Sequence, residues 1–442
     1  MLTLNGYQLP KDSRELALKK ALTVRPFSFV NPMAQPKYPV YHETKTHLYV
    51  PKHFGIERFG IPTTTRDVPE TSGRFWDFTG SLRPVQLPVV NSFLLPEPHD
   101  GIISLHTGGG KTVCALYIAS RLRVPTLVIV HNTFLRDQWI DRVKAFLPNA
   151  RIGRVQADVA DVVDKDVVIV MLQTLSMKEL NDSLFTPIGL VIVDECHHIA
   201  SEVFVQALPK VTSKYMLGLS ATPDRKDKLM YAIHWFLGPL LYKSETGDSV
   251  DTQVNVEVYE YKNDDPEFNE IVMSSQGMVS VPIMVNKLTG CEDRTKWLCG
   301  ILEDISEGGR QILVLSDRVQ HCQDILAGLS PELRETACIL GTAVKPELRT
   351  EYCKTKAILI ATYSMCKEGF DVPTLNTLVM ATPRPDIDQI VGRILRVEKK
   401  GRVVHPLIVD IVDPQFRRQF GMRNGLYKKR QYRVTKMALP PL

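Results

Sequence analysis

Short apolar runs alternate with amphipathic stretches along most of the chain. The strand-like runs lie at 101–105, 126–131, 167–171 and 190–193. A weaker region at about 226–308 holds one possible strand, 254–261, and the alternation resumes at 311–315, 337–340, 357–361, 377–381 and 403–412. Helix-like stretches such as 135–146 separate them. Short apolar strands joined by amphipathic helices are typical of a parallel sheet that is covered on both faces. The pattern therefore predicts an α/β protein with two such sheets in tandem.

The first 80 residues break this pattern. Prolines and aromatic residues are frequent there, and His47–Val50 is the clearest strand candidate. We therefore predict a small β-rich accessory domain at the N-terminus and a basic tail at the C-terminus. The predicted boundaries are 1–80 for the accessory domain, 81–248 and 249–415 for the two α/β domains, and 416–442 for the tail.

Composition narrows the class of protein. The chain has 442 residues, of which 44% are apolar, enough for more than one core. No apolar window of about 18 residues occurs, so we expect no membrane span, and the N-terminus lacks the features of a secretory signal. The eight cysteines are scattered, with no Cys-x-x-Cys pair. This argues against a disulfide framework and indicates an intracellular, reducing compartment, either cytoplasm or nucleus.

The stretch Leu105–Thr112 has the layout of a phosphate-binding loop. It reads Leu-His-Thr-Gly-Gly-Gly-Lys-Thr and lies between an apolar run and a helix-like segment. Glycines let backbone N–H groups curl around an anion, and the helix N-terminus adds positive potential. We expect Lys111 to reach the β- and γ-phosphates of ATP and Thr112 to ligate Mg²⁺. Leu105 stands where the full motif has glycine, so a glycine turn that binds nothing is the alternative.

Two carboxylates, Asp194 and Glu195, follow the apolar run Leu190–Val193. Mg²⁺ prefers oxygen ligands, so we expect Asp194 to hold the Mg²⁺ shell. Glu195 is expected to orient and deprotonate the water that attacks the γ-phosphate. Solvated acids at a strand end are the alternative. Two histidines follow, but the order is not His-Glu-x-x-His, so the pattern does not favour a zinc site.

Two further segments are candidates for chemistry. A helix predicted over Gln389–Arg396 would place Arg393 and Arg396 one turn apart, opposite an apolar face. Two such arginines can stabilise charge on a transferring phosphoryl group, although a solvated basic helix has the same pattern. The apolar run Met216–Leu219 ends in small hydroxyl residues that we expect to link the nucleotide to motion.

The C-terminal segment is strongly basic. From Pro414 onward there is no acidic residue, and aromatic residues are interleaved with the lysines and arginines. Such a composition suits a nucleic-acid strand, through phosphate neutralisation and base stacking. A solvated, partly frayed tail fits equally well. The proposed nucleic-acid contacts here are Arg417, Arg418, Lys428, Lys429 and Arg430.

Taken in order, these motifs resemble the superfamily 2 helicases and translocases. The order is a phosphate loop, Asp-Glu-Cys-His, Ser-Ala-Thr and Gln-x-x-Gly-Arg-x-x-Arg, and the resemblance covers about 82–415. The loop itself resembles that of the XPB and UvsW branch, which accounts for Leu105, although His106 stands where that branch often has proline. The branch includes helicases of large DNA viruses and phages. The resemblance implies two RecA-like domains.

The resemblance also implies roles for particular residues. ATP contacts are expected from Arg83, Gln86, Thr107, Gly108, Gly109, Gly110, Lys111, Thr112, Gly369 and Asp371. Coupling of ATP hydrolysis to motion is expected from His197, Ser220, Thr222 and Gln389. Contacts to the nucleic-acid strand are expected from Asn132, Thr174 and Thr362.

The implied function is an ATP-dependent DNA helicase with ATP and Mg²⁺ as cofactors. It would move 3′ to 5′ on forks, recombination intermediates or transcription bubbles, alongside proteins of replication, repair or transcription. RNA is not excluded as the strand. Two alternatives are a double-strand translocase that separates no strands and a nucleotide-binding scaffold without nucleic-acid-stimulated ATPase.

Overall fold

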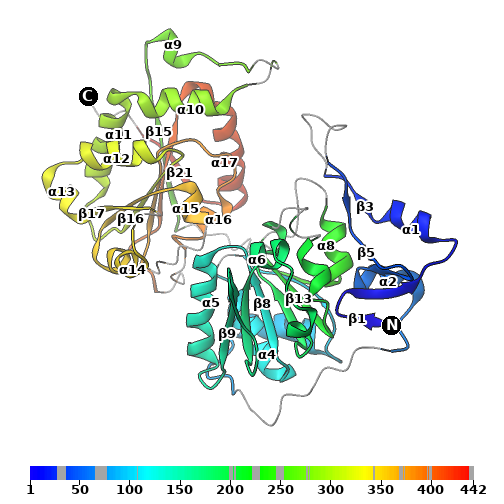
Figure 1. Cartoon of the computed structure of the whole chain (residues 1–442). Helices are drawn as coiled ribbons and strands as arrows, with labels where there is room; N and C mark the ends of the chain where they lie inside the picture. Colours follow the sequence, from blue (N-terminus) through cyan, green and yellow to red (C-terminus); the bar gives the residue numbers. More distant parts are fainter. Residues whose placement is uncertain are drawn as a thin grey trace. The chain divides into compact units, whose positions relative to one another are not determined.

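The computed structural model divides into two compact units, Met1–Thr246 and Gly247–Leu442 (Figure 1). The structure describes residues 1–26, 36–64, 77–106, 108–198, 203, 206–221, 229–244, 253–274, 277, 279–341, 344–367, 372, 374–395, 397 and 401–437. Each unit is built on its own large sheet, as the alternation of apolar runs predicts.

The first unit begins with a small antiparallel sheet. Its described strands have the order β1 (Leu2–Thr3), β2 (Gly6–Pro10), β6 (His47–Val50) and β5 (His42–Glu43). The other elements of this region are α1 (Glu15–Ala21), the pair β3 (Thr23–Val24) and β4 (Tyr38–Pro39), and α2 (Lys52–Phe59).

Helix α2 fastens this small sheet to the rest of the unit. The Lys52 Nζ lies 2.6 Å from Asp100 Oδ2 and donates to the backbone carbonyls of Ser213 and Lys214 at 3.1 and 2.7 Å. The ring of Phe54 packs edge-on against Trp235 at 5.1 Å. The N-terminal region is β-rich as predicted, but it packs onto the first large sheet and belongs to the same compact unit.

The first large sheet is parallel apart from one edge strand. Its described strands have the order β10-β9-β11-β8-β12-β13-β7-β14, in which only β10 runs antiparallel to its neighbour. The strands are β7 (Gly101–Ser104), β8 (Thr126–Val130), β9 (Ile152–Gln156), β10 (Val159–Asp161), β11 (Val167–Met171), β12 (Leu190–Val193), β13 (Tyr215–Ser220) and β14 (Leu240–Lys243). The helical elements are η1 (Pro84–Gln86), α3 (Leu87–Leu94), α4 (Lys111–Leu122), α5 (Thr133–Phe146), α6 (Leu172–Met177), η2 (Asp182–Phe185), η3 (Cys196–His198), η4 (Leu208–Lys210) and α8 (Met230–Leu237).

The second sheet is parallel throughout its described strands. Their order is β17-β18-β16-β19-β20-β15-β21. The strands are β15 (Asn255–Glu260), β16 (Ile312–Ser316), β17 (Ala337–Leu340), β18 (Ile358–Thr362), β19 (Thr377–Met380), β20 (Leu407–Val412) and β21 (Arg433–Lys436). The helical elements are α9 (Pro266–Asn269), α10 (Val281–Gly290), α11 (Glu292–Ile305), α12 (Val319–Gly328), α13 (Pro331–Thr336), α14 (Pro346–Thr355), α15 (Tyr363–Lys367), α16 (Asp388–Val391), η6 (Pro414–Phe416) and α17 (Arg417–Lys429).

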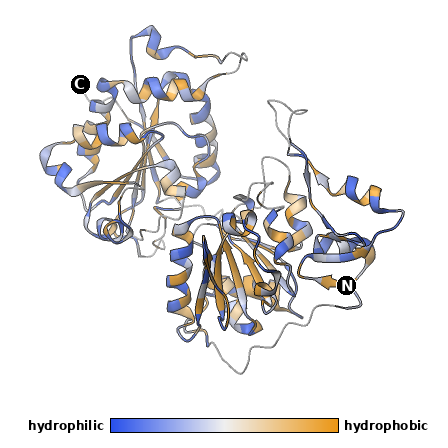
Figure 2. Cartoon of the chain, viewed as in Figure 1, coloured by the Kyte–Doolittle hydropathy of each residue, from blue (hydrophilic) through white to orange (hydrophobic). Residues whose placement is uncertain are grey.

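Both large sheets are buried on both faces. In β8, Leu127 and Ile129 enter one apolar core, while Val128 and Val130 enter the core on the opposite face. The residues of β16 divide between two cores in the same way. The central strands are accordingly hydrophobic along their whole length (Figure 2). Among the described residues, no helix combines the length and the apolar character that a membrane span requires.

The structure corrects the prediction of a basic tail over 416–442. Helix α17 packs in the second unit, and β21 extends its sheet by pairing with β15. Arg423 is 1% exposed, and its Nε and Nη2 donate to the carboxylate of the buried Asp410. Tyr427 donates to the same carboxylate at 2.7 Å. A frayed tail is therefore wrong for 417–436, because these side chains neutralise and bond an acid inside the sheet.

Replacing Arg423 should destabilise the second unit. The substitution Arg423→Met leaves the Asp410 carboxylate buried without its counter-charge, which costs roughly 3–5 kcal/mol of unfolding free energy. Arg418→Met, on the exposed side of the same helix, should cost within about 0.5 kcal/mol. Urea denaturation followed by circular dichroism measures both, and equal midpoints for the two variants would contradict a structural role for the Arg423–Asp410 pair.

Candidate ATP site and nucleic-acid face

The phosphate loop starts one residue later than the general motif suggests. Leu105 is 4% exposed and belongs to the apolar core. Its N–H donates to the Ser220 carbonyl at 2.9 Å, which continues the β7–β13 pairing. Leu105 is therefore a core residue at the end of β7, and a glycine there would remove an apolar side chain from the core.

Glycines at the second half of the loop have the backbone conformation that the motif requires. Gly108 and Gly110 have φ of +83° and +88°, values that favour glycine. Helix α4 then begins at Lys111, so its first N–H groups face the loop. Thr107, another predicted ATP contact, lies outside the described residues.

The side chains of Arg83 and Gln86 donate hydrogen bonds to backbone carbonyls of this loop. The Gln86 Nε2 donates to the Gly109 carbonyl at 3.1 Å, and its Oε1 accepts from the Arg83 N–H at 2.9 Å. The Arg83 guanidinium donates to the Gly108 carbonyl at 3.1 Å. A Cβ on Gly110 would lie 2.1 Å from Gln86 Nε2. Both polar atoms of the Gln86 amide thus bind the protein backbone, and its role as an adenine contact stays a prediction.

The expected catalytic residues meet beside the loop. Lys111 Nζ lies 2.6 Å from Glu195 Oε1. Asp194 is 6% exposed, and its carboxylate accepts from Trp139 Nε1 at 2.8 Å and from the Glu195 N–H at 2.9 Å. The sequence analysis missed Trp139, since nothing in the composition of α5 connects it to β12.

The charges at this strand end favour a cation. Burial and the charge of Glu195 raise the pKa of Asp194, against the opposing effects of Lys111 and the Trp139 N–H. Two carboxylates and one lysine leave net negative charge, and Mg²⁺ needs few protein oxygens because phosphates and waters complete its shell. Thr112, in the first turn of α4, and Asp194 are the donors that would hold it. Among the described residues, no cluster of three or more His, Cys, Asp or Glu could hold a metal by itself.

Glu195 is also connected to the end of β13. Its φ of +47° is unusual for a residue with a Cβ and turns the chain sharply after β12. Its Oε2 lies 3.5 Å from His197 Nδ1, and the same nitrogen lies 2.9 Å from the buried Ser220 Oγ. His197 and Ser220, both predicted to couple hydrolysis to motion, are therefore hydrogen-bonded to each other, and His197 lies close to the Glu195 carboxylate. Thr222 lies outside the described residues.

Two residues of the first unit that are predicted to contact nucleic acid lie beyond the ends of two paired β-strands. Asn132 follows β8, and Thr174 follows β11, which pairs with β8. Asn132 accepts from the Leu135 N–H at 2.8 Å and so caps α5. Thr174 accepts from the Ala157 N–H at 3.3 Å. Their contact with nucleic acid stays a prediction, and each also has a local structural role.

The predicted helix with two arginines is shorter than expected. Helix α16 spans Asp388–Val391 and includes Gln389, but Arg393 lies in a turn beyond it, where its N–H donates to the Ile390 carbonyl. Gly392 follows the last helical residue, and glycine is a poor residue for continuing a helix. The helix therefore ends before Arg393, whereas the face with two arginines stays a prediction; Ile390, on the expected apolar side, is buried. Arg396, Gly369 and Asp371 lie outside the described residues.

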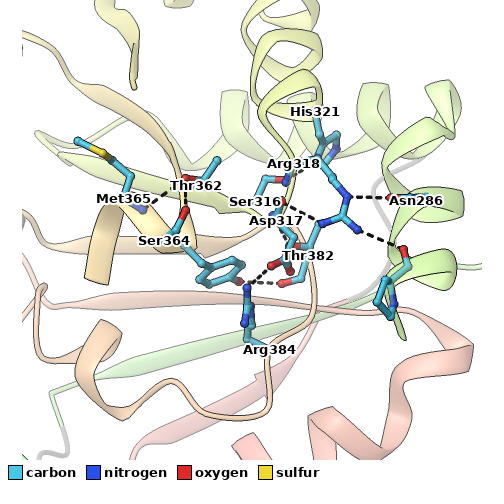
Figure 3. Close-up of polar contacts among 12 residues, drawn as sticks. Asn286, Ser316, Asp317, Arg318, His321, Thr362, Ser364, Met365, Thr382 and Arg384 are labelled. Carbon is cyan, nitrogen blue, oxygen red and sulfur yellow. Dashed lines mark hydrogen bonds and ion pairs between the residues drawn. The ribbon is translucent and has the colours of Figure 1, made fainter. Parts of the chain in front are cut away.

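Polar side chains also gather where the strands of the second sheet end (Figure 3). Thr362, which is predicted to contact nucleic acid, is the last residue of β18. Its hydroxyl lies 2.9 Å from the Ser364 hydroxyl. Asp317 follows β16, and Arg384, which comes after β19, forms an ion pair with it. The sequence analysis missed both charged residues, although each follows an apolar run as Asp194 does.

The C-terminal basic residues divide into two groups. Arg417, Arg418, Lys428 and Lys429 are exposed. Arg430 is partly buried and forms an ion pair with Asp388. The exposed side chains of the first group are accessible to a nucleic-acid backbone, and their contact with it stays a prediction.

The family follows from comparison with known proteins. Residues 79–225 match the family described as type III restriction enzyme, res subunit. A "putative ATP-dependent RNA helicase" of Acanthamoeba polyphaga mimivirus is 31% identical, over 98% of this chain and 86% of its own length. A "probable helicase" of Escherichia phage T5 is 27% identical, over 85% of each chain. The chain belongs to the superfamily 2 helicases, a family of ATP-dependent enzymes that act on nucleic acid, and its relatives include viral and phage members.

A solved structure supports the predicted fold. The structure of a Saccharomyces cerevisiae Dbp5 variant bound to RNA and ADP BeF3 matches 80% of this chain and 89% of that chain, with a TM-score of 0.56 and 14% identity. At this identity the similarity concerns the fold alone. The prediction of RecA-like parallel-sheet domains is confirmed.

The contact between Gln86 and the loop leads to a test of loop geometry. Gly110→Ala should weaken ATP binding at least about tenfold, because its Cβ displaces the Gln86 amide. Gly60→Ala is the matched control, since Gly60 has a similar φ of +81° and no atom within 4 Å of an added Cβ. Titration with a fluorescent ATP analogue measures both affinities. Equal affinity for Gly110→Ala and the unsubstituted protein would show that the loop tolerates the displacement.

Proposed function

We propose that this protein hydrolyses ATP to move 3′ to 5′ along one DNA strand and to separate the strands of a duplex. The observation that carries the proposal is the network Lys111–Glu195–His197–Ser220 beside the phosphate loop. It joins the residues expected to bind and hydrolyse ATP to the end of β13. The proposal rests on this network and on membership of the family.

The network suggests how the nucleotide acts on the protein. The γ-phosphate of ATP would replace Glu195 as the partner of Lys111, because both are anions that suit one ammonium group. Glu195 would then be released to orient and deprotonate the attacking water. The release would also change the contact between Glu195 and His197, which is bonded to Ser220. Mg²⁺, held by Thr112 and Asp194, would neutralise phosphate charge during the reaction.

DNA is the strand we propose, and the matched family supports this choice, while the exposed basic residues would suit either DNA or RNA. The matched family is described by a restriction-enzyme subunit, a class of enzyme that acts on DNA. The exposed basic residues of α17, such as Arg417 and Lys428, suit binding to a nucleic-acid backbone without sequence preference. The mimivirus relative carries the name of an RNA helicase, so RNA is the competing strand. The double-strand translocase is the second candidate function, because the same motor would serve it.

Glu195→Gln tests the catalytic assignment. The amide should keep ATP binding and lower nucleic-acid-stimulated turnover about 10²- to 10⁴-fold, because it no longer deprotonates water. Glu97→Gln is the control, since Glu97 is exposed and precedes the amino end of β7. Phosphate release and ATP affinity are measured on both variants. Retention of most of the turnover by Glu195→Gln would refute the assignment.

A panel of strands tests the substrate. ATPase rates and strand displacement are measured on matched DNA and RNA single strands, forks and duplexes, with overhangs of either polarity. We expect the greatest stimulation by DNA and displacement from 3′ overhangs. Greater stimulation by RNA would overturn the choice of DNA. Triplex displacement without duplex displacement would favour the double-strand translocase, and no stimulation by any strand would refute the proposed function.

A further inference from the structure

Three neighbouring strands of the second sheet end in one polar cluster (Figure 3). Strand β16 pairs with β18 on one side and with β19 on the other. Because all three are parallel, their carboxyl ends lie at the same edge of the sheet. Asp317 follows β16, Thr362 and Ser364 lie at the end of β18, and Thr382 and Arg384 follow β19. The cluster thus combines hydroxyl donors with the carboxylate of Asp317 and the guanidinium of Arg384, and Arg318 lies beside it (Figure 3).

Arg384 is only partly satisfied by its partner. Its Nη2 donates to Asp317 Oδ1, while its Nε is buried and has no hydrogen-bond partner among the described residues. The guanidinium lies over the Tyr363 ring at 5.0 Å, which fixes its plane. The side chain is nevertheless 39% exposed. An arginine presents Nε and an Nη as parallel donors that suit two oxygens of one anion, and Asp317 fills only one of them.

Asp317 has two hydrogen bonds besides the one that it accepts from Arg384. Its Oδ2 accepts from the Thr382 hydroxyl at 3.0 Å, and its own N–H donates to the same hydroxyl oxygen at 3.0 Å. The Thr382 carbonyl in turn accepts from the Tyr363 hydroxyl at 2.7 Å. The carboxylate would therefore stay in place if the guanidinium changed partner.

The backbone of Arg384 is fixed independently of its side chain. The Arg423 Nη1 donates to the Arg384 carbonyl at 2.9 Å. Arg423 is itself held in place because its Nε and Nη2 donate to the carboxylate of the buried Asp410. The attachment point is thus rigid, and the partly exposed guanidinium is the part that can exchange one oxyanion for another.

Building on the proposed function, we propose that Arg384 binds a backbone phosphate of the nucleic-acid strand and that Asp317 neutralises Arg384 until the phosphate replaces it. The hydroxyls of Thr362 and Ser364, 2.9 Å apart at the same edge, supply neighbouring donors to that backbone. A phosphate would approach the exposed part of the guanidinium and take over the Nη2 donor that Asp317 occupies, because Nε itself is buried. Asp317 therefore lowers the affinity of Arg384 for phosphate, because a phosphate can bind only by displacing the Asp317 carboxylate.

A purely structural ion pair is the competing explanation. The two explanations predict opposite changes in nucleic-acid affinity when the charge of Asp317 is removed. If Asp317 competes with phosphate, removing its charge tightens strand binding while removing Arg384 weakens it. If the pair only stabilises the fold, both substitutions lower stability and weaken binding together. The variants are Arg384→Ala and Asp317→Asn, which keeps the size of the side chain and its contacts with Thr382.

The experiment measures binding of fluorescein-labelled oligo-dT and oligo-U by anisotropy over a series of KCl concentrations. Arg384→Ala should raise Kd roughly 5- to 20-fold and reduce the salt slope by about 0.7, the value for one phosphate contact on a single strand. Asp317→Asn should lower Kd by roughly threefold or more. Arg334→Ala and Glu332→Gln are the charge-matched controls, because both residues are exposed in α13, which precedes the amino end of β17.

The outcomes separate this inference from the proposed function. Opposite shifts of Kd for the two variants, on dT or on U, support the exchange of Asp317 for phosphate. Weaker binding by both variants, with equally lowered unfolding temperatures, overturns it, and so does behaviour like that of the controls. Arg384→Gln replaces Arg384→Ala if the alanine variant does not fold. If the unsubstituted protein binds neither strand and neither strand stimulates its ATPase, the proposed function itself has failed.

Discussion

A strand that is covered on both faces can present a polar side chain to a ligand only beyond its ends. Both large sheets obey this constraint, because the residues of β8 and of β16 divide between cores on the two faces. Parallel pairing then aligns the carboxyl ends of neighbouring strands at one edge. The phosphate loop after β7, Asp194 after β12 and Ser220 at the end of β13 are neighbours for that reason. Asp317 and Thr362 are brought together in the second sheet by the same rule.

Runs of apolar residues with polar ends were the most informative part of the sequence. They predict β11 and β12 with the bounds that the structure shows, because both strands are buried on both faces and apolar at every position. The same reasoning locates the catalytic candidates Asp194 and Glu195. The phosphate-loop motif alone does not account for Leu105. The structure does, because the Leu105 side chain fills part of the apolar core where the general motif has glycine.

Ion pairs between residues that are distant in the sequence were not predicted, and neither were buried charges that lie within a basic segment. Arg423 stands among exposed basic residues and looks like them in the sequence, but the fold places it against the buried Asp410. Arg384 and Asp317 are 67 residues apart, and only the order of the strands brings them together. Each failure concerns a contact that a single stretch of sequence does not contain.

The attachment of the N-terminal sheet affects how the first unit can be divided. Lys52 contacts Asp100, just before β7, and the carbonyls of Ser213 and Lys214, just before β13. The far ends of those two strands carry the phosphate loop and Ser220. The N-terminal sheet therefore supports the starting ends of the two strands on which the nucleotide chemistry depends. A chain shortened to residues 79–225, the region that matches the family, would keep the phosphate loop, Asp194 and Ser220 but lose the support beneath them.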